Sequence, residues 1–156
     1  MTFTVEGVHH IGITVSDMQR SFDWYTKMFG LVPGPVNHGS GPELETGVQV
    51  EGAELDFSMI QIGSTRIEFL EYTHPEGKPF ELRNCDVGAT HICLQVDDME
   101  AAFRTLTERG AVFNGDPVTL QDGELAGSKW AYLRDPDGIQ LEIWQWPTQG
   151  THPAAS

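Results

Sequence analysis

The sequence predicts an α+β fold made of two βαβββ modules that share one plan. An internal repeat is the first observation behind this prediction, because HIGITVSDMQRSF (10–22) returns as HICLQVDDMEAAF (91–103). Each copy also begins with a run of β-branched residues and continues with apolar residues at helical spacing. Each half then ends with an apolar–Glu–apolar triplet, at 67–69 and at 141–143. Chance is a poor explanation for two matches in the same order.

Each module is expected to open with a strand, over 8–15 and 90–96, because these stretches are rich in Val and Ile and are bounded by Gly and Asp. A helix should follow. Ser16 with Gln19, and Asp97 with Glu100, have the spacing of a capping box. The apolar positions that repeat with helical spacing are Met18, Phe22, Tyr25 and Phe29 in the first module and Met99, Phe103 and Leu106 in the second.

The two helices are expected to end at glycine, a residue that accepts the left-handed conformation of a helix C-cap, at Gly30 and Gly110. Four further strands are predicted, over 55–62, 66–72, 130–134 and 139–145. Turns at 63–64 and 135–138 separate them in pairs.

These elements predict the organisation of the chain. The first module covers 7–72, a linker 73–88, the second module 89–146 and a flexible tail 147–156. The Gly- and Pro-rich stretch 33–43 is expected to be a loop, either a passive connection or a lid over a site.

Composition excludes several classes of function. The 156 residues carry 9 Lys and Arg against 23 Asp and Glu, a formal net charge of −14, which disfavours nucleic acid and anionic membranes as partners. No apolar run is long enough to cross a membrane, and the first residues lack the pattern of a secretory signal. Cys85 and Cys93 have neither zinc-finger nor CxxC spacing, so we expect reduced thiols and a cytoplasmic location.

Strand alternation predicts where chemistry lies, because neighbouring side chains point to opposite faces. The apolar faces must pack under the helices. His10 and His91 then lie on the opposite faces, and so do Glu68 and Glu142 near the end of each module. A carboxylate on such a face needs a partner, and imidazole with carboxylate suits a divalent metal such as Zn, Fe, Mn, Co or Ni. If the two sheets close together, these four side chains converge.

The other histidines and Glu71 are weaker candidates for metal ligands. His9 falls on the helix side of its strand and is expected to be packed or partly exposed. Glu71 faces away from Glu68 and, at a strand end, should be solvated. His38 lies in the predicted loop and is either a surface residue or part of a lid, while His74 and His152 are expected on the surface of linker and tail.

These residues resemble the vicinal oxygen chelate superfamily, which includes glyoxalase I, methylmalonyl-CoA epimerase, extradiol dioxygenases and bleomycin resistance proteins. The resemblance covers about residues 7–146 and rests on the two module openings and on LRDPDGIQLEIW (133–144). It implies an open, cup-shaped mixed β-sheet barrel with helices outside, enclosing one metal ion. It also implies His10, Glu68, His91 and Glu142 as ligands, and a homodimer in which the modules pair either within one chain or across the two chains.

The resemblance implies an isomerase, epimerase or lyase of the glyoxalase type. Such an enzyme chelates two neighbouring oxygens of a small substrate on its metal, and Glu142 or Glu68 would act as the base. The alternatives are an Fe(II) dioxygenase using His10, His91 and Glu142, and a metal-free drug-binding protein. Side chains that would contact a substrate are Arg66, Trp130, Tyr132, Trp144 and His38.

Overall fold

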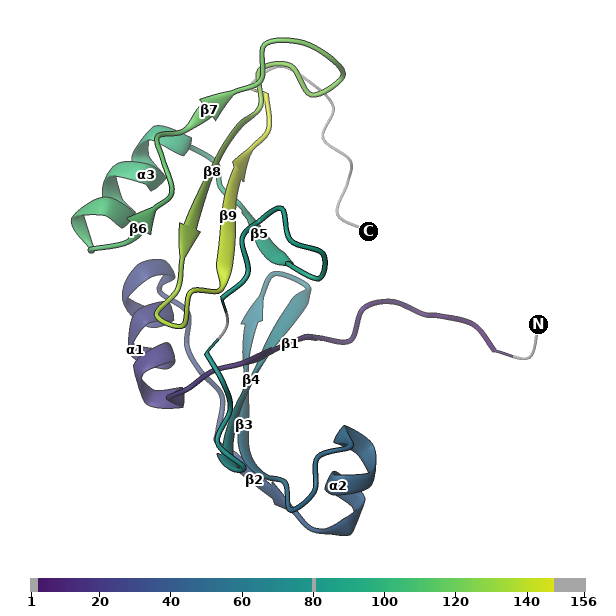
Figure 1. Cartoon of the computed structure of the whole chain (residues 1–156). Helices are drawn as coiled ribbons and strands as arrows, with labels where there is room; N and C mark the ends of the chain where they lie inside the picture. The colour runs from purple at the N-terminus through teal and green to yellow at the C-terminus, as the bar shows by residue number, and fades with distance from the viewer. Residues whose placement is uncertain (1–2, 80, 148–156) are drawn as a thin grey trace. The chain divides into compact units, whose positions relative to one another are not determined.

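The computed structural model describes residues 3–79 and 81–147, and the chain divides into two compact units at Pro79 (Figure 1). We call them the N-terminal and the C-terminal unit and describe each by itself. Each unit contains one mixed sheet and a long helix, which confirms the predicted α+β class. The closure of the two sheets into one cup-shaped barrel stays a prediction.

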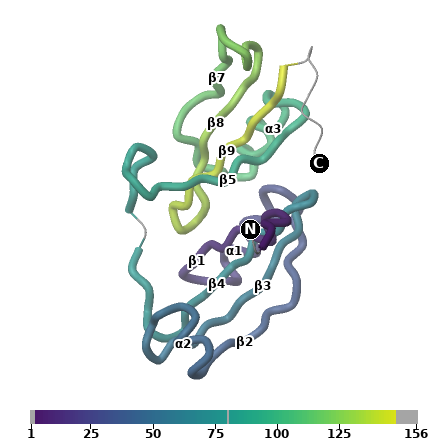
Figure 2. The backbone as a smooth tube through the Cα atoms, turned by 90° about the vertical axis from the view of Figure 1, so that its right-hand side faces the viewer, coloured from purple at the N-terminus to yellow at the C-terminus, as the bar shows by residue number. Residues whose placement is uncertain are grey.

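The N-terminal unit contains a four-stranded sheet in the order β1-β4-β3-β2. Its innermost pair is the long hairpin of β3 and β4, and β1 runs parallel to β4. Figure 2 shows β2, β3 and β4 side by side. The elements are β1 (Ile11–Thr14), α1 (Met18–Phe29), β2 (Asn37–Ser40), α2 (Pro42–Val48), β3 (Glu54–Ile62) and β4 (Thr65–His74).

The C-terminal unit repeats this plan with a sheet in the order β5-β9-β8-β6, in which β7 also pairs with β8. Here β5 runs parallel to β9, as β1 does to β4. The elements are β5 (His91–Gln95), α3 (Met99–Glu108), β6 (Val112–Phe113), β7 (Val118–Thr119), β8 (Lys129–Arg134) and β9 (Gln140–Gln145).

One face of each sheet forms a hydrophobic core with the long helix of its unit. In the N-terminal unit the ring of Phe69 on β4 meets Phe22 and Tyr25 of α1, with centroids 5.8 and 5.0 Å apart. In the C-terminal unit the fully buried side chains include Met99 of α3 together with Leu133, Leu141 and Ile143 of β8 and β9. Each such side chain contributes about 1.5–3 kcal/mol. The predicted apolar faces are therefore the ones that pack under the helices.

The helices begin one residue later than the predicted capping boxes. Asp17 accepts a hydrogen bond from the Arg20 amide (2.9 Å), and Asp98 accepts one from the Ala101 amide (3.0 Å). Both aspartates have extended backbone, and an aspartate carboxylate is favoured at the positive end of a helix. The assignment of Ser16 and Asp97 as caps was therefore wrong. Gly30 caps α1 as predicted. The C-cap of α3 is Arg109 rather than the predicted Gly110, which follows it with φ of 93°.

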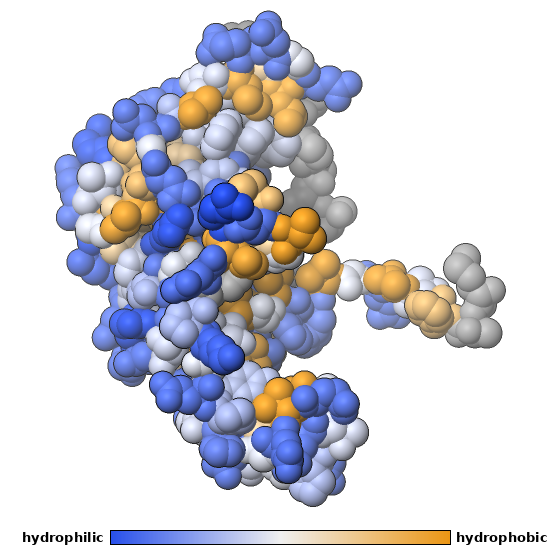
Figure 3. Space-filling model, in the orientation of Figure 1, coloured by the Kyte–Doolittle hydropathy of each residue, from blue (hydrophilic) through white to orange (hydrophobic). Residues whose placement is uncertain are grey.

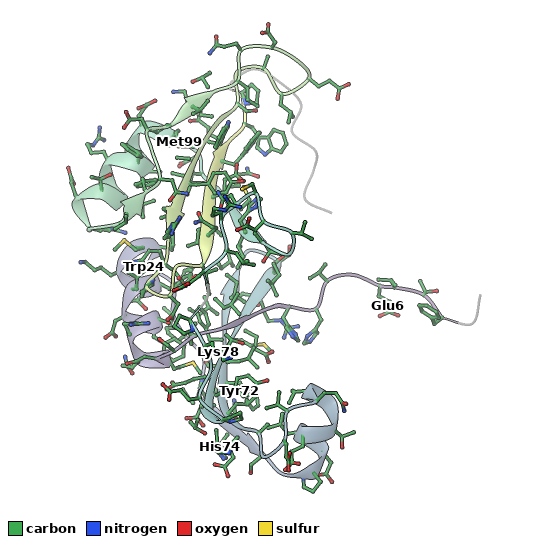
Figure 4. All side chains as sticks on the ribbon, in the orientation of Figure 1. Glu6, Trp24, Tyr72, His74, Lys78 and Met99 are labelled. Atoms are coloured by element: carbon green, nitrogen blue, oxygen red, sulfur yellow. The ribbon has the colours of Figure 1, made fainter. Side chains whose placement is uncertain are left out.

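At the start of each long helix, a side chain from a strand of the same unit also accepts a backbone hydrogen bond. Glu71 of β4 accepts the amide of Met18 through Oε2 (2.8 Å), and Gln145 of β9 accepts the amide of Met99 through Oε1 (2.7 Å). Figure 4 labels Met99 at the beginning of α3. The expectation that Glu71 is solvated was wrong, because its carboxylate accepts the Met18 amide, which has no partner within the helix.

The stretch predicted as a loop, 33–43, instead contains β2 and the start of α2. Polar residues fill β2, and its backbone pairing with β3 leaves no hydrophobic signature in the sequence. Gly41, with φ of 97°, and Pro42 mark a helix start rather than a longer loop. The strand β4 continues through Thr73 and His74, into the stretch predicted as a linker.

Of the predicted flexible tail, 147–156, only Pro147 belongs to the described residues. Among the described helices, none has the length and apolar character that spanning a membrane requires.

Candidate metal site

A histidine and a glutamate meet on the sheet face opposite the helix in each unit; we call this face the site face. In the N-terminal unit, His10 Nε2 lies 3.2 Å from Glu68 Oε2. In the C-terminal unit, His91 Nε2 lies 3.0 Å from Glu142 Oε2. Sequence reasoning predicted these four residues and this face. The structure brings them together as two pairs, one in each unit.

The parallel strand pairs explain why the same two residue types meet twice. Gly12 of β1 is the register partner of Glu68, and Cys93 of β5 is the register partner of Glu142. In both units the histidine precedes that partner by two residues, so it lies on the same face as the glutamate. The two pairs are equivalent products of one strand arrangement.

Both glutamates are more buried than the histidines beside them. The side chains of Glu68 and Glu142 are 16% and 9% exposed, whereas those of His10 and His91 are 35% and 44% exposed. A carboxylate with so little access to water requires compensation, which a neutral imidazole supplies only in part. The donor atoms that face each other, imidazole nitrogen and carboxylate oxygen, are those that divalent transition metals bind.

His9 orients the ring of His10. The Nδ1 atoms of the two rings lie 2.7 Å apart and the ring centroids 5.0 Å apart, nearly perpendicular. If His10 is the donor in this contact, its Nε2 keeps the lone pair that would bind a metal ion. This is the arrangement that a ligating histidine requires. His9 is exposed, and nothing in the strand pattern assigns it this contact.

The C-terminal pair has two additional polar neighbours. The hydroxyl of Tyr132 lies 3.3 Å from His91 Nε2, and Cys93 lies beside Glu142. Burial, and then the charge of Glu142, raise the pKa of Tyr132, while burial and Glu142 raise the pKa of the Cys93 thiol to about 12. Both groups are therefore protonated at neutral pH and present donors to the Glu142 carboxylate.

The N-terminal pair lacks these donors. Met59 is the register partner of Glu68 on β3, as Tyr132 is of Glu142 on β8, and Gly12 replaces Cys93. A side chain at Gly12 would meet Leu70 Cδ1 at 3.4 Å and Glu68 Oε2 at 4.0 Å. The two pairs thus contain the same two residue types and differ in the residues around them.

The described residues contain no cluster of three or more His, Cys, Asp or Glu side chains arranged to hold a metal. Each unit offers two donors of the right chemistry, so the predicted set of four ligands divides into two halves. Their joining around one ion stays a prediction.

The other predicted contact residues have distinct positions. His38 lies on β2, where its Nδ1 is 2.8 Å from Asp56 Oδ1, so its placement in a loop was wrong. Arg66 of β4 lies opposite Gln61 of β3. It precedes Glu68 by two residues and lies on the same face. Trp130 and Trp144 are register partners on β8 and β9, next to Tyr132. Their contact with a substrate stays a prediction.

Sequence reasoning gave no role to His9, Glu71, Cys93 or Gln145. Alternation places Cys93 on the face of His91, which is the signal that could have found it. The equivalent positions of Glu71 and Gln145, three residues after each paired glutamate, could have revealed the helix anchors. No sequence signal gives the contact between His9 and His10.

The repeat, the strand order and the two His–Glu pairs are those expected of the vicinal oxygen chelate superfamily. Residues 7–143 match the Glyoxalase/Bleomycin resistance protein/Dioxygenase superfamily, and the chain belongs to this superfamily. The predicted family is therefore confirmed.

Individual relatives agree with this assignment. The chain is 32% identical over 145 residues to 2-epi-5-epi-valiolone epimerase of an Actinomyces species, covering 90% of this chain and 79% of the relative. It is 29% identical over 140 residues to lactoylglutathione lyase of Escherichia coli O157:H7, covering 86% and 88%. A glyoxalase family protein of Bacillus cereus shares the fold, with a TM-score of 0.75, 17% identity and coverage of 94% and 97%.

Proposed function

We propose that the chain is a divalent-metal-dependent epimerase that inverts a carbon next to a carbonyl in a small oxygenated substrate. The observation that carries the proposal is the pair of equivalent His–Glu contacts, at 3.2 and 3.0 Å, with both carboxylates largely buried. The 32% identity to an epimerase over 90% of this chain supports the reaction class.

His10, Glu68, His91 and Glu142 would hold the ion, which is Ni, Co, Mn, Zn or Fe. When bound, such an ion polarises a substrate carbonyl together with a neighbouring oxygen and lowers the pKa of the adjacent C–H bond. The substrate is a small molecule, and a second copy of the chain is the expected partner, as the family resemblance implies.

The glutamates supply proton transfer in this proposal. Epimerisation breaks a C–H bond, leaves its electron pair on the carbonyl carbon–oxygen system, and then returns a proton to the opposite face of the same carbon. A carboxylate oxygen of Glu142 or Glu68 accepts the proton. The carboxyl group so formed exchanges its proton with water, and the exchanged proton is the one returned to the carbon.

A lyase reaction is the second candidate, favoured by the 29% identity to lactoylglutathione lyase over most of both chains. It would use the same residues and the same proton abstraction. The dioxygenase alternative needs three ligands and open positions for substrate and oxygen. The close contact of Glu68 with His10 supports a fourth ligand, which would occupy one of those positions.

The first test measures metal content and proton exchange together. We expect near-stoichiometric divalent metal by plasma mass spectrometry in untagged protein, and loss or weakening of that metal in Glu68→Gln. Wild-type protein in D₂O should incorporate deuterium into 2-epi-5-epi-valiolone, and Glu142→Gln should not.

Glu108→Gln is the matched control, because Glu108 is an exposed glutamate on α3 and belongs to neither pair. Full metal and full turnover in both Glu68→Gln and Glu142→Gln would refute the proposal. Turnover of lactoylglutathione without exchange into the cyclic ketone would favour the lyase.

A further inference from the structure

Two tryptophans lie next to the buried glutamate of the C-terminal unit. Trp130 of β8 and Trp144 of β9 are direct register partners, and the next pair on the same face is Tyr132 with Glu142. Two residues along a strand correspond to about 7 Å. A molecule lying on the two indoles therefore reaches the Glu142 carboxylate with its edge.

Neighbouring rings hold both indoles in place. Trp130 meets Tyr132 with ring centroids 5.5 Å apart at 81°, and Trp144 meets Trp146 at 5.7 Å and 71°. The indole nitrogen of Trp146 in turn donates to Gln95 Oε1 (3.1 Å). Apolar surface that is fixed before binding loses little conformational entropy when a ligand arrives.

The tryptophans do not belong to the hydrophobic core of the unit. That core lies on the other side of the sheet, under α3, where Leu133, Leu141 and Ile143 are fully buried. Trp130 and Trp144 are only partly buried, on the site face. Apolar rings with a few polar groups at one edge are typical of small-molecule sites.

The charges near this surface disfavour an anionic ligand. Along the site face of β5, β8 and β9, Arg134 is the one arginine or lysine, and its Nε donates to Asn114 Oδ1 (3.3 Å). Lys129 lies on the helix side of β8, paired with Glu100 at 2.8 Å. Arg134 lies four residues from Trp130, about 13 Å along β8, so the charged side chain next to the indoles is that of Glu142. An anionic group over the indoles is therefore disfavoured, whereas hydroxyl groups find donors and acceptors in Tyr132 and Glu142.

The N-terminal unit has no equivalent of this surface. The register partners at the corresponding positions are Leu70 and Phe57, next to Glu68. Neither has an indole face, so the repeat is asymmetric at this point. The asymmetry would place a ring-shaped substrate on the C-terminal unit and its reacting carbon near Glu142.

From these observations, and resting on the proposed function, we infer that Trp130 and Trp144 are specificity-determining residues for an uncharged, polyhydroxylated six-membered ring ketone. The carbon–hydrogen face of the ring lies on the indoles. The hydroxyl groups at its rim face Tyr132 and Glu142. We call Trp130 and Trp144 the platform. It indicates which class of substrate the proposed site accepts.

The test measures binding rather than turnover. The probe is scyllo-inosose, a neutral pentahydroxycyclohexanone, added to the metal-loaded full chain and followed by saturation-transfer NMR and tryptophan fluorescence. We expect magnetisation transfer to the ring C–H protons. The variants Trp144→Leu and Trp130→Phe introduce the residue types of Leu70 and Phe57, which hold the corresponding positions of the N-terminal unit. We expect the double variant to bind about ten-fold more weakly.

The control is Trp24→Phe, since Trp24 lies on α1 (Figure 4) and packs against Tyr25 and Phe29. This variant should bind as wild type does. Metal content and circular dichroism confirm that the double variant is folded and loaded. Trp130→Phe with Trp144→Phe, which keeps two flat rings, should retain most of the affinity.

The possible outcomes separate this inference from the proposed function. Unchanged affinity in the folded Trp130→Phe, Trp144→Leu double variant overturns the platform even if epimerisation proceeds. Competition by methylmalonyl-CoA or lactoylglutathione as strong as by the neutral ring also overturns it. Platform-dependent binding without deuterium exchange leaves the platform intact and overturns the proposed function.

Discussion

Glu142 shows how one carboxylate changes the groups around it. Its side chain contacts His91, and its charge raises the pKa of both Tyr132 and Cys93. Each proton that these neighbours retain offsets part of the cost of keeping the carboxylate away from water. The same position in the N-terminal unit has Met59 and Gly12 for neighbours, so Glu68 relies on His10 to a greater extent.

Both cysteines are exposed to solvent, yet their thiols should differ in reactivity. With a pKa of about 12, Cys93 is almost entirely the unreactive thiol at pH 8, because the thiolate is the nucleophile. In metal-free protein at that pH we expect iodoacetamide to alkylate Cys85 first, as seen by peptide mass spectrometry. Removing the negative charge in Glu142→Gln lowers the pKa of Cys93 and speeds its labelling.

The acceleration should be partial, since burial is the largest cause of the raised pKa of Cys93. Equal labelling of Cys85 and Cys93 in the wild type would contradict the assigned environment. Glu68→Gln, in the other unit, is the matched control and should leave the labelling rate of Cys93 unchanged.

At the scale of the elements, each strand that carries a paired glutamate also holds a helix. Glu71 and Gln145 lie three residues after Glu68 and Glu142, on the opposite face, and accept the first helix amides. The strand that carries the paired glutamate and the helix that covers the core are therefore connected by one side chain. A shift of the helix would displace that strand.

This connection predicts an asymmetric effect of substitutions at Glu71. Glu71→Ala leaves the Met18 amide without its acceptor, and we expect a loss of about 1–2 kcal/mol in the free energy of unfolding. Glu71→Gln keeps an acceptor of the type that Gln145 provides and should cost less than about half as much. Urea denaturation measures both.

The comparison of the two substitutions identifies the interaction. Equal losses in Glu71→Ala and Glu71→Gln would show that the negative charge, rather than the acceptor, stabilises α1. The absence of any loss in Glu71→Ala would show that the contact contributes nothing to stability.

The elements that sequence predicted best are those with a strong apolar pattern. Met18, Phe22 and Tyr25 share one helix face, and Ile67 and Phe69 share one strand face, so periodicity alone places them. The strand β2 was not predicted, because Asn37–Ser40 lacks apolar residues and is fixed by backbone pairing with β3. The helix caps were predicted one residue early, because Ser16 and Asp17 offer equally good sequence patterns.

The two His–Glu pairs could be predicted from the sequence, and the groups around them could not. The parity of strand positions places His10 with Glu68 and His91 with Glu142. The shifted pKa of Cys93 depends on burial, and the contact of His9 with His10 depends on ring orientation, neither of which sequence spacing contains. The interaction of His38 with Asp56 requires knowledge of the β2–β3 register.

For the whole molecule, the central question is whether the two His–Glu pairs act together. If one ion needs all four side chains, loss of either histidine should abolish tight binding. A divalent ion at one hundred times its Kd would stabilise the folded chain by about 2.7 kcal/mol. That corresponds to a rise in Tm of roughly 5–10 °C for a chain of this size.

We expect this thermal shift with Ni²⁺ or Co²⁺ in the wild type and its removal by a chelator. His10→Ala and His91→Ala should each lose it, and the double variant should lose nothing further, because the ligands act as one set. His38→Ala is the control, since His38 is paired with Asp56 outside both pairs. Shifts that halve in each single variant would indicate two independent ions.

The segment before β1 leads directly into a candidate metal ligand. Residues 3–10 form neither strand nor helix, and Phe3, Val5 and Val8 are largely exposed along this segment (Figure 3). His9 and His10, which meet through their Nδ1 atoms, follow directly. A polyhistidine tag joined to this segment would put further imidazoles about ten residues from a candidate ligand. The tag would compete for the ion and would alter the content that the experiment reports. Purification through a cleavable C-terminal tag, or without one, keeps the count of bound metal a property of the protein.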